Sequence, residues 1–131
     1  MLDTDICIHL IRHRPKILLQ RIMEQTPGSL VLSSITVAEL QYGVRKSRQP
    51  ELNHEALRLF LRPFDLLPFD TAAAERYGRI RATLELQGLP IGPLDTLIGS
   101  HALHLGAILV THNLREFSRI EGLRLEDWVN Q

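Results

Sequence analysis

The sequence predicts an α/β fold in which a small, mostly parallel sheet lies between two layers of helices, a three-layer α/β/α sandwich. Short apolar segments typical of strands alternate along the chain with longer segments that have helical periodicity. Strands separated by helices pair in parallel, and the helices cover both faces of the sheet. A length of 131 residues without linker, repeat or low-complexity stretch predicts one domain over residues 1–131.

The first expected elements come from two short apolar stretches. "MLD" predicts a strand from Met1 to Asp3, and Asp5 follows as the expected N-cap of a first helix. "LVL" at 30–32 predicts a second strand, and the serines after it predict a turn. A helix is then expected from about Thr36.

Helical spacing of apolar residues marks the middle of the chain. Residues 52–60 predict a helix that Pro63 ends, and "FDLLPFD" at 64–70 predicts a short strand. A long helix over 71–87 carries its apolar residues on one stripe and is closed by Gly88.

The last part of the chain repeats this alternation. Pro93 suits the first turn of a helix that Gly106 terminates. "AILVT" at 107–111 is the plainest strand in the sequence, 114–120 predict another helical turn, and 123–128 predict a final edge strand. Helical residues are therefore expected to outnumber strand residues clearly.

Composition and charge narrow the class of protein. Lys plus Arg and Asp plus Glu number 15 each, which excludes a uniform electrostatic grip on nucleic acid but not a local one. Of the 15 basic residues, 13 are Arg, whose planar fork suits phosphate. Cys7 lies among apolar residues and is expected to be buried rather than disulfide-bonded. No signal peptide or membrane span is recognisable, so a cytoplasmic location is expected.

Polar residues follow two of the expected strands at the ends where ligands bind in open α/β sheets. Asp3 ends the first strand, and residues 111–113, "THN", leave the end of the strand at 107–111. These two loops share one rim if their strands are neighbours in the sheet. His112 lies in this region and is a weaker candidate for contact with substrate.

Two further acids interrupt apolar helical segments. Glu39 lies within "ITVAELQYGV", and Asp95 within "GPLDTLIGSHAL". Each has an ordinary explanation, because Glu39 fits a solvated helix position and Asp95 complements the helix dipole in a first turn. Taken together with Asp3 and Glu116, however, they are four carboxylates beside element ends. Oxygen-only clusters of this kind favour hard divalent cations, which would relieve the repulsion between carboxylates and support phosphodiester hydrolysis.

Four segments in order resemble the PIN-domain toxins of VapC type. These are "MLDTDICIHLI", "SSITVAELQYGVRKS", "GLPIGPLDTLIGSHAL" and "ILVTHNLREFSRIEGLRLEDW", and together they span essentially the whole chain. The resemblance implies a PIN-like sandwich and an endoribonuclease that depends on Mg²⁺, with Mn²⁺ as a substitute ion. Asp3, Glu39 and Asp95 fall on the family's acidic positions, with Asp3 and Asp95 as the expected metal ligands.

The assignment of a residue to the family's fourth acidic position is less direct. Many members of the family have Asp where this chain has Asn113, whereas the enteric-type members carry the Glu of "HNxxEF", which is Glu116 here. The resemblance therefore implies Glu116 as the fourth acid and Asn113 as a neutral neighbour that holds a metal-bound water.

The resemblance also implies partners. They are a cognate VapB-type antitoxin, a second copy of the chain in a homodimer, and an RNA substrate. This sequence shares "GxPIGxxD" and "EDW" with one branch of the family, whose members cut initiator tRNA in its anticodon loop, so the resemblance implies the same substrate here. An acidic pocket further suggests that the antitoxin brings a basic side chain, Arg above all, into the site. Aromatic residues make up only 5% of the chain, so RNA recognition is expected to depend on arginine. The basic candidates for RNA contact are Arg45, Lys46, Arg48, Arg79, Arg81 and Arg115.

Two other functions remain open at this point. "LDTD" also fits the D-x-D of haloacid-dehalogenase-like phosphatases, although the only lysines, Lys16 and Lys46, lack a suitable position for that chemistry. A catalytically silent PIN-like module that binds RNA or protein is the second alternative, although retention of all four acids argues against it. His101 and His104 have a spacing compatible with zinc, but no third ligand at matching spacing accompanies them.

Overall fold

The computed structural model describes residues 1–130 of the chain. In this range the elements are, in order, α1 (Thr4–His13), α2 (Lys16–Met23), β1 (Val31–Ser33), α3 (Ser34–Lys46), α4 (Pro50–Leu61), β2 (Asp65–Leu67), α5 (Thr71–Leu86), α6 (Pro93–Leu105), β3 (Leu109–Val110), α7 (Leu114–Phe117) and β4 (Leu125–Glu126). None of the helices in the described range is both long enough and apolar enough to cross a bilayer.

The sheet is joined in its middle by the first residues of the chain. β1 pairs in parallel with β2, and β3 pairs in parallel with β4. Leu2 connects these two pairs, because its N–H donates to Val31 O at 3.2 Å and it forms a parallel bridge with Val110. The resulting order is β2, β1, residues 1–3, β3, β4. The strand predicted from Met1 to Asp3 thus has the right place but is shorter than predicted, since only Leu2 of these residues forms a bridge.

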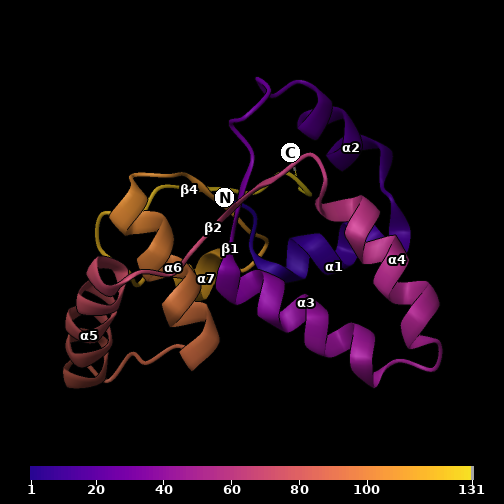
Figure 1. Cartoon of the computed structure of the whole chain (residues 1–131). Helices are drawn as coiled ribbons and strands as arrows, with labels where there is room; N and C mark the ends of the chain where they lie inside the picture. Colours follow the sequence, from indigo (N-terminus) through magenta and orange to yellow (C-terminus); the bar gives the residue numbers. More distant parts are fainter. Residues whose placement is uncertain (131) are drawn as a thin grey trace.

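Helices cover both faces of this sheet (Figure 1). Leu2 and Val110 contribute to a core shared with α1, α2, α3 and α4, whereas Met1 and Leu109 contribute to a second core with α5, α6 and α7. Neighbouring residues of a strand point to opposite faces, which is why consecutive apolar residues feed two different cores. The predicted three-layer α/β/α arrangement is confirmed.

Most of the predicted helix boundaries are also confirmed. Pro93 opens α6, and Gly106 ends it with a φ of 66° in the left-handed region. α2 is a helix that the sequence pattern did not predict, and Leu18 is its only fully buried residue. Cys7 is a free, fully buried thiol, as expected, and burial raises its pKa.

The N-cap of α1 corrects a prediction. Asp3, not Asp5, caps this helix, because Asp3 Oδ1 accepts the Ile6 N–H at 2.9 Å. Asp5 is exposed in the first turn. The error arises because the pairing ends at Leu2, so that Asp3 is the residue that directly precedes the helix and occupies the capping position.

Gly99 allows α6 to approach the segment around α7 closely. A Cβ at Gly99 would lie 2.6 Å from Ile120 Cδ1 and 3.3 Å from Phe117 Cδ1, and both of these side chains are buried. The close approach holds α7, which has only four residues, against α6. Glu116 is carried by this short helix, so Gly99 contributes to its position.

We expect Gly99→Ala to destabilise the fold by about 1–2 kcal/mol, because an added methyl group overpacks the contact with Ile120 and Phe117. Gly78→Ala is the control, since Gly78 is a helical glycine like Gly99. Unlike Gly99, it is exposed, and a Cβ added there would meet nothing within 4 Å. There alanine should stabilise by about 0.5–1 kcal/mol through its helix propensity. Urea denaturation measures both variants, and equal effects of the two would contradict the close packing at Gly99.

Candidate active site

We call the edge of the sheet where Leu2 and β3 end the rim, and Asp3 is the most buried of the four predicted acids there. Its side chain is 3% exposed, and its N–H donates to Val110 O at 3.0 Å, which fixes it at the centre of the sheet. Oδ1 caps α1 through Ile6, and Oδ2 accepts the Thr111 hydroxyl at 2.5 Å. The two loops predicted to share one rim therefore meet directly, because Thr111 follows β3 and bonds the acid that follows Leu2.

The electrostatic surroundings of Asp3 disfavour its charge. Burial raises its pKa to about 6, and the negative charges of Asp5 and Asp95 act in the same direction, while the hydrogen bonds from Thr111 and Ile6 lower the pKa in part. A buried carboxylate that faces further acids is expensive without a counter-charge. The hydrogen bonds from Thr111 and Ile6 therefore compensate only part of the negative charge that Asp3 and its neighbouring acids bring together.

Asp95 belongs to the same electrostatic cluster. It lies in the first turn of α6, half-buried, and its pKa is raised to about 6 by burial and then by the charges of Asp5, Glu39 and Glu116. The N-cap residue of α6 is Gly92, which offers no side chain to the free N–H groups. Asp95 is therefore the acid that interacts electrostatically with all the others, namely Asp3, Glu39, Glu116 and the exposed Asp5.

Glu39 is held by the hydroxyl of Thr4, which in turn contacts the hydroxyl of Thr36, and the sequence pattern singled out neither threonine. Thr4 Oγ1 donates to Glu39 Oε1 at 2.7 Å, and the hydroxyl oxygens of Thr4 and Thr36 are 3.1 Å apart. Thr4 and Thr36 are buried, whereas Glu39 is half-buried. Since the one Thr4 proton goes to the carboxylate, Thr36 supplies the proton between the hydroxyls. The only signal in the sequence that Thr4 contributes to the site is its position between the two acids Asp3 and Asp5.

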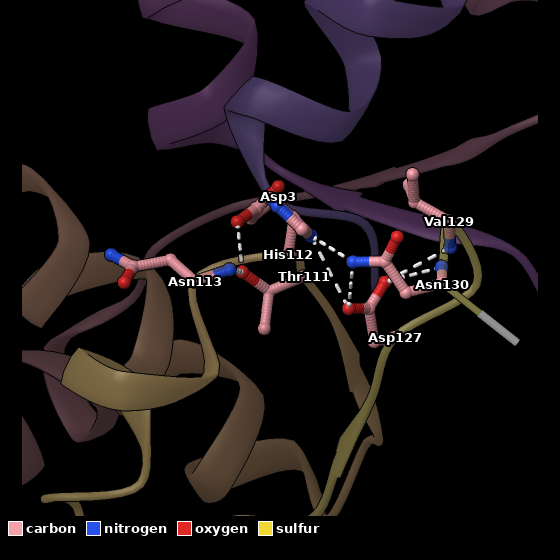
Figure 2. A network of polar contacts seen from close by, with 7 residues as sticks. All are labelled: Asp3, Thr111, His112, Asn113, Asp127, Val129 and Asn130. Carbon is pink, nitrogen blue, oxygen red and sulfur yellow. Dashed lines mark hydrogen bonds and ion pairs between the residues drawn. The ribbon is translucent and has the colours of Figure 1, made fainter.

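A second polar chain runs from Asp3 to Glu116. Thr111 Oγ1, which donates to Asp3, also accepts the Asn113 N–H at 2.9 Å (Figure 2). The Asn113 side-chain amide in turn donates to Glu116 Oε2 at 3.2 Å. Asn113 thereby orients the predicted fourth acid, and Thr111, another residue to which the sequence pattern assigned no role, links both acids.

His112 lies beside this chain and is held by the C-terminal segment (Figure 2). Its Nδ1 is 3.2 Å from Asp127 Oδ2 and 3.1 Å from Asn130 Nδ2, and most of its side chain is exposed. Burial alone would raise the pKa of Asp127, but the hydrogen bonds from Val129 N–H, His112 and Asn130 N–H outweigh it and hold the pKa below its usual range. The imidazole is therefore anchored at the rim with one edge open to solvent.

The acids are not gathered as a ready-made set of metal ligands. Among residues 1–130, no group of three His, Cys, Asp or Glu side chains has the mutual distances of a metal site. The zinc interpretation of the histidine pair finds no support either, since His101 Nδ1 lies 2.8 Å from Ser33 Oγ and His104 Nε2 lies 4.0 Å from Asp70 Oδ1. The donor set at the rim consists of carboxylate oxygens, which hard divalent cations prefer.

The phosphatase alternative lacks its lysine. Lys16 is exposed at the start of α2, and Lys46 is exposed at the end of α3, where its Nζ lies 5.6 Å from the centre of the Tyr42 ring. Glu126 belongs to β4 and accepts the Trp128 indole N–H at 2.8 Å. No lysine of the described chain is thus placed to bind a phosphate beside Asp3.

Comparisons with known proteins agree with this geometry. The family model described as "PIN domain" matches residues 1–123. The "tRNA(fMet)-specific endonuclease VapC" of Shigella flexneri is 46% identical over 128 residues, which cover 98% of this chain and 96% of that protein. Among solved structures, DNA-bound VapBC from Salmonella typhimurium is similar with a TM-score of 0.94 at 44% identity, covering 98% of this chain and 96% of that one. VapBC2 from Rickettsia felis, bound to a DNA fragment from its promoter, gives 0.93 at 41% identity, with 98% and 97% covered.

Proposed function

Because the chain belongs to the PIN-domain family, and within it to the VapC ribonucleases of toxin–antitoxin systems, we propose that Asp3, Glu39 and Asp95 form its RNA-cleaving centre. The observation that supports this most is the placement of Asp3. Asp3 is buried where the central strand position ends, and its pKa is raised by burial and by two further acids. Capping α1 does not require this negative charge, because asparagine caps a helix as well as aspartate does, so the charge itself favours a functional role. Glu116 is the proposed fourth acid.

The residues present fit a divalent cation. Divalent-metal dependence is general among PIN-domain nucleases, and the oxygen-only donors at the rim are those that Mg²⁺ and Mn²⁺ select. We propose Mg²⁺, with Mn²⁺ as a substitute, held by Asp3 and Asp95. When bound, such an ion stabilises negative charge on the phosphate and lowers the pKa of water.

The chain's own groups supply orientation and proton transfer. Glu39 is fixed through Oε1 by the Thr4 hydroxyl, which leaves Oε2 available as a base for an attacking water. Asn113 holds Glu116 by one oxygen in the same manner. Holding each carboxylate by one oxygen limits the reorganisation that the reaction requires.

The proposed substrate is the anticodon loop of initiator tRNA, by analogy with the relative named as a tRNA(fMet)-specific endonuclease. An unpaired loop exposes phosphates and splayed bases, which suits a site with few aromatic residues. The proposed partners are a VapB-type antitoxin and a second copy of the chain in a homodimer. A basic side chain of the antitoxin would neutralise the acids at the rim and so block the site.

RNA-end sequencing tests the proposal. The purified full chain, incubated with total tRNA and millimolar Mg²⁺, should produce new ends at one loop position of initiator tRNA, and EDTA should abolish them. Cleavage in other RNAs but not in initiator tRNA would remove the proposed substrate and keep the ribonuclease. Absence of any cleavage with Mg²⁺ or Mn²⁺ would refute the catalytic role and favour a silent binding module.

A further inference from the structure

A basic hollow lies between α5 and the segment that follows α7. It has a volume of about 420 Å³, and residues of α5, α6 and the loop after α7 line it. Apolar side chains form part of its wall, and its polar lining is Arg76, Arg79, Thr83, Gln87, Arg119 and Glu121. Three guanidinium groups thus face one hollow that contains a single carboxylate.

These three arginines form no ion pair within the described part of the chain, unlike other helical arginines of the protein. Arg58 is bound through two nitrogens to Glu55, and Arg81 is bound to Glu85. No carboxylate within residues 1–130 lies at ion-pair distance from Arg76, Arg79 or Arg119. The positive charge of the hollow is therefore unmatched by its own protein.

Arg76 gives a second, independent indication of a ligand. Its Nε is buried, yet it has no hydrogen-bond partner among the described residues. Buried polar groups are ordinarily satisfied, so this orphaned donor, on a residue that lines the hollow, favours a partner that is not part of the chain. Since Arg is a donor only, this partner must be an acceptor.

The hollow adjoins the acidic site through two short connections. Arg119 follows Glu116 by three residues, and its N–H donates to Glu116 O at 3.1 Å. Its guanidinium donates to Pro90 O at 2.9 Å, in the segment that leads into α6 and Asp95. Arg119 thus belongs to the hollow and is tied by its backbone and its side chain to the two segments that carry acids of the rim.

We propose that this hollow binds a backbone phosphate of the RNA substrate, a few nucleotides from the bond that is cut. The inference rests on the proposed ribonuclease function. Guanidinium forks suit phosphate oxygens, and the Thr83 hydroxyl and Gln87 amide supply further donors. A phosphate anchored here lets a protein of zero net charge retain a long RNA without attracting polyanions over its whole surface.

Binding of a synthetic RNA stem-loop to the full chain in EDTA tests the proposal. The double variant Arg76→Gln/Arg79→Gln is expected to weaken binding by about 5- to 20-fold and to reduce the slope of log K against log salt by about 1, since the contact with one phosphate is lost. Arg58→Gln is the charge-matched control for the single variant Arg79→Gln, because each removes one positive charge and Arg58 lies at an exposed helix position away from the hollow. Arg79→Gln alone, at an exposed position, keeps the test valid if the double variant does not fold.

Cleavage of a short oligonucleotide that spans only the acidic site should be unchanged in the Arg76 and Arg79 variants. If the control weakens binding as much as these variants, or if they bind the stem-loop like the wild type, the inference is wrong. Weaker binding of the antitoxin with unchanged RNA binding would also overturn it, in favour of a protein ligand. Failure of the wild type to cut any RNA would instead refute the proposed function, which keeps the two outcomes distinct.

Discussion

Substitution of Asp3 by asparagine is expected to reduce RNA cleavage by about a hundredfold or more, which is the usual loss when one electrostatic group of a catalytic centre is removed. Asparagine keeps the side-chain shape and is as good an N-cap as aspartate, so α1 should still begin at Thr4. The substitution removes one negative charge at the centre of the rim, and with it the acceptor of the Thr111 hydroxyl, since the amide nitrogen of asparagine only donates. Glu39→Gln and Asp95→Asn should have effects of similar size, because they remove charges of the same cluster.

The measurement is the initial rate of cleavage of a labelled tRNA at saturating Mg²⁺, with circular dichroism to verify the fold. Asp65→Asn provides the control, since Asp65 is an exposed aspartate of β2 with no contact to the acids. An Asp3→Asn protein that cuts RNA within threefold of the wild-type rate, while Asp65→Asn behaves normally, would exclude Asp3 from the chemistry.

The same Asp3→Asn substitution is expected to stabilise the metal-free protein by about 2–3 kcal/mol at about pH 7.5, because a pKa raised from 3.8 to about 6 corresponds to roughly two units. The sign follows from proton binding. A folded-state pKa above that of the unfolded chain means that the folded protein holds the proton more tightly. The ionised Asp3 therefore destabilises the fold above pH 6, and this penalty disappears as the pH falls towards 4.

Urea denaturation in EDTA measures this effect at about pH 7.5, 5 and 4. The difference between variant and wild type should shrink towards zero at the lowest pH, and comparison of the two proteins cancels the contribution of the buried His101, whose pKa is lowered by burial. Addition of Mg²⁺ should stabilise the wild type and leave Asp3→Asn nearly unchanged. A difference that is independent of pH would show that lost or gained packing, rather than charge, is responsible.

Local signals made the helix boundaries predictable. Pro93 restricts the backbone in the first turn of α6, and Gly106 permits the left-handed conformation that ends the helix, so both residues mark α6 without reference to the rest of the chain. Strand lengths were not predictable in this way, because pairing across the sheet decides them. "AILVT" reads as a five-residue strand, yet only Leu109 and Val110 pair.

The acids of the candidate site were noticeable in the sequence for a similar reason. A carboxylate in an apolar segment, such as Glu39 or Asp95, is conspicuous in a sequence. The groups that hold the acids were not, because Thr4, Thr36 and Thr111 are unremarkable residues whose role arises only where the strands meet. Asp5 was misassigned because both Asp3 and Asp5 are suitable N-cap residues, and only the position where the strand ends decides between them.

The central place of the first three residues in the sheet has a consequence for synthesis of the protein. Asp3 reaches Thr111 across a sequence separation of 108 residues, and the Met1 amino group donates to Ile108 O across 107. Contacts of such high contact order form late, because almost the entire chain must be looped before they close. A nascent chain on the ribosome therefore has no assembled rim until its last strands have emerged. The proposed RNA-cleaving centre therefore assembles only after residues 108–111 have been synthesised and have left the ribosome.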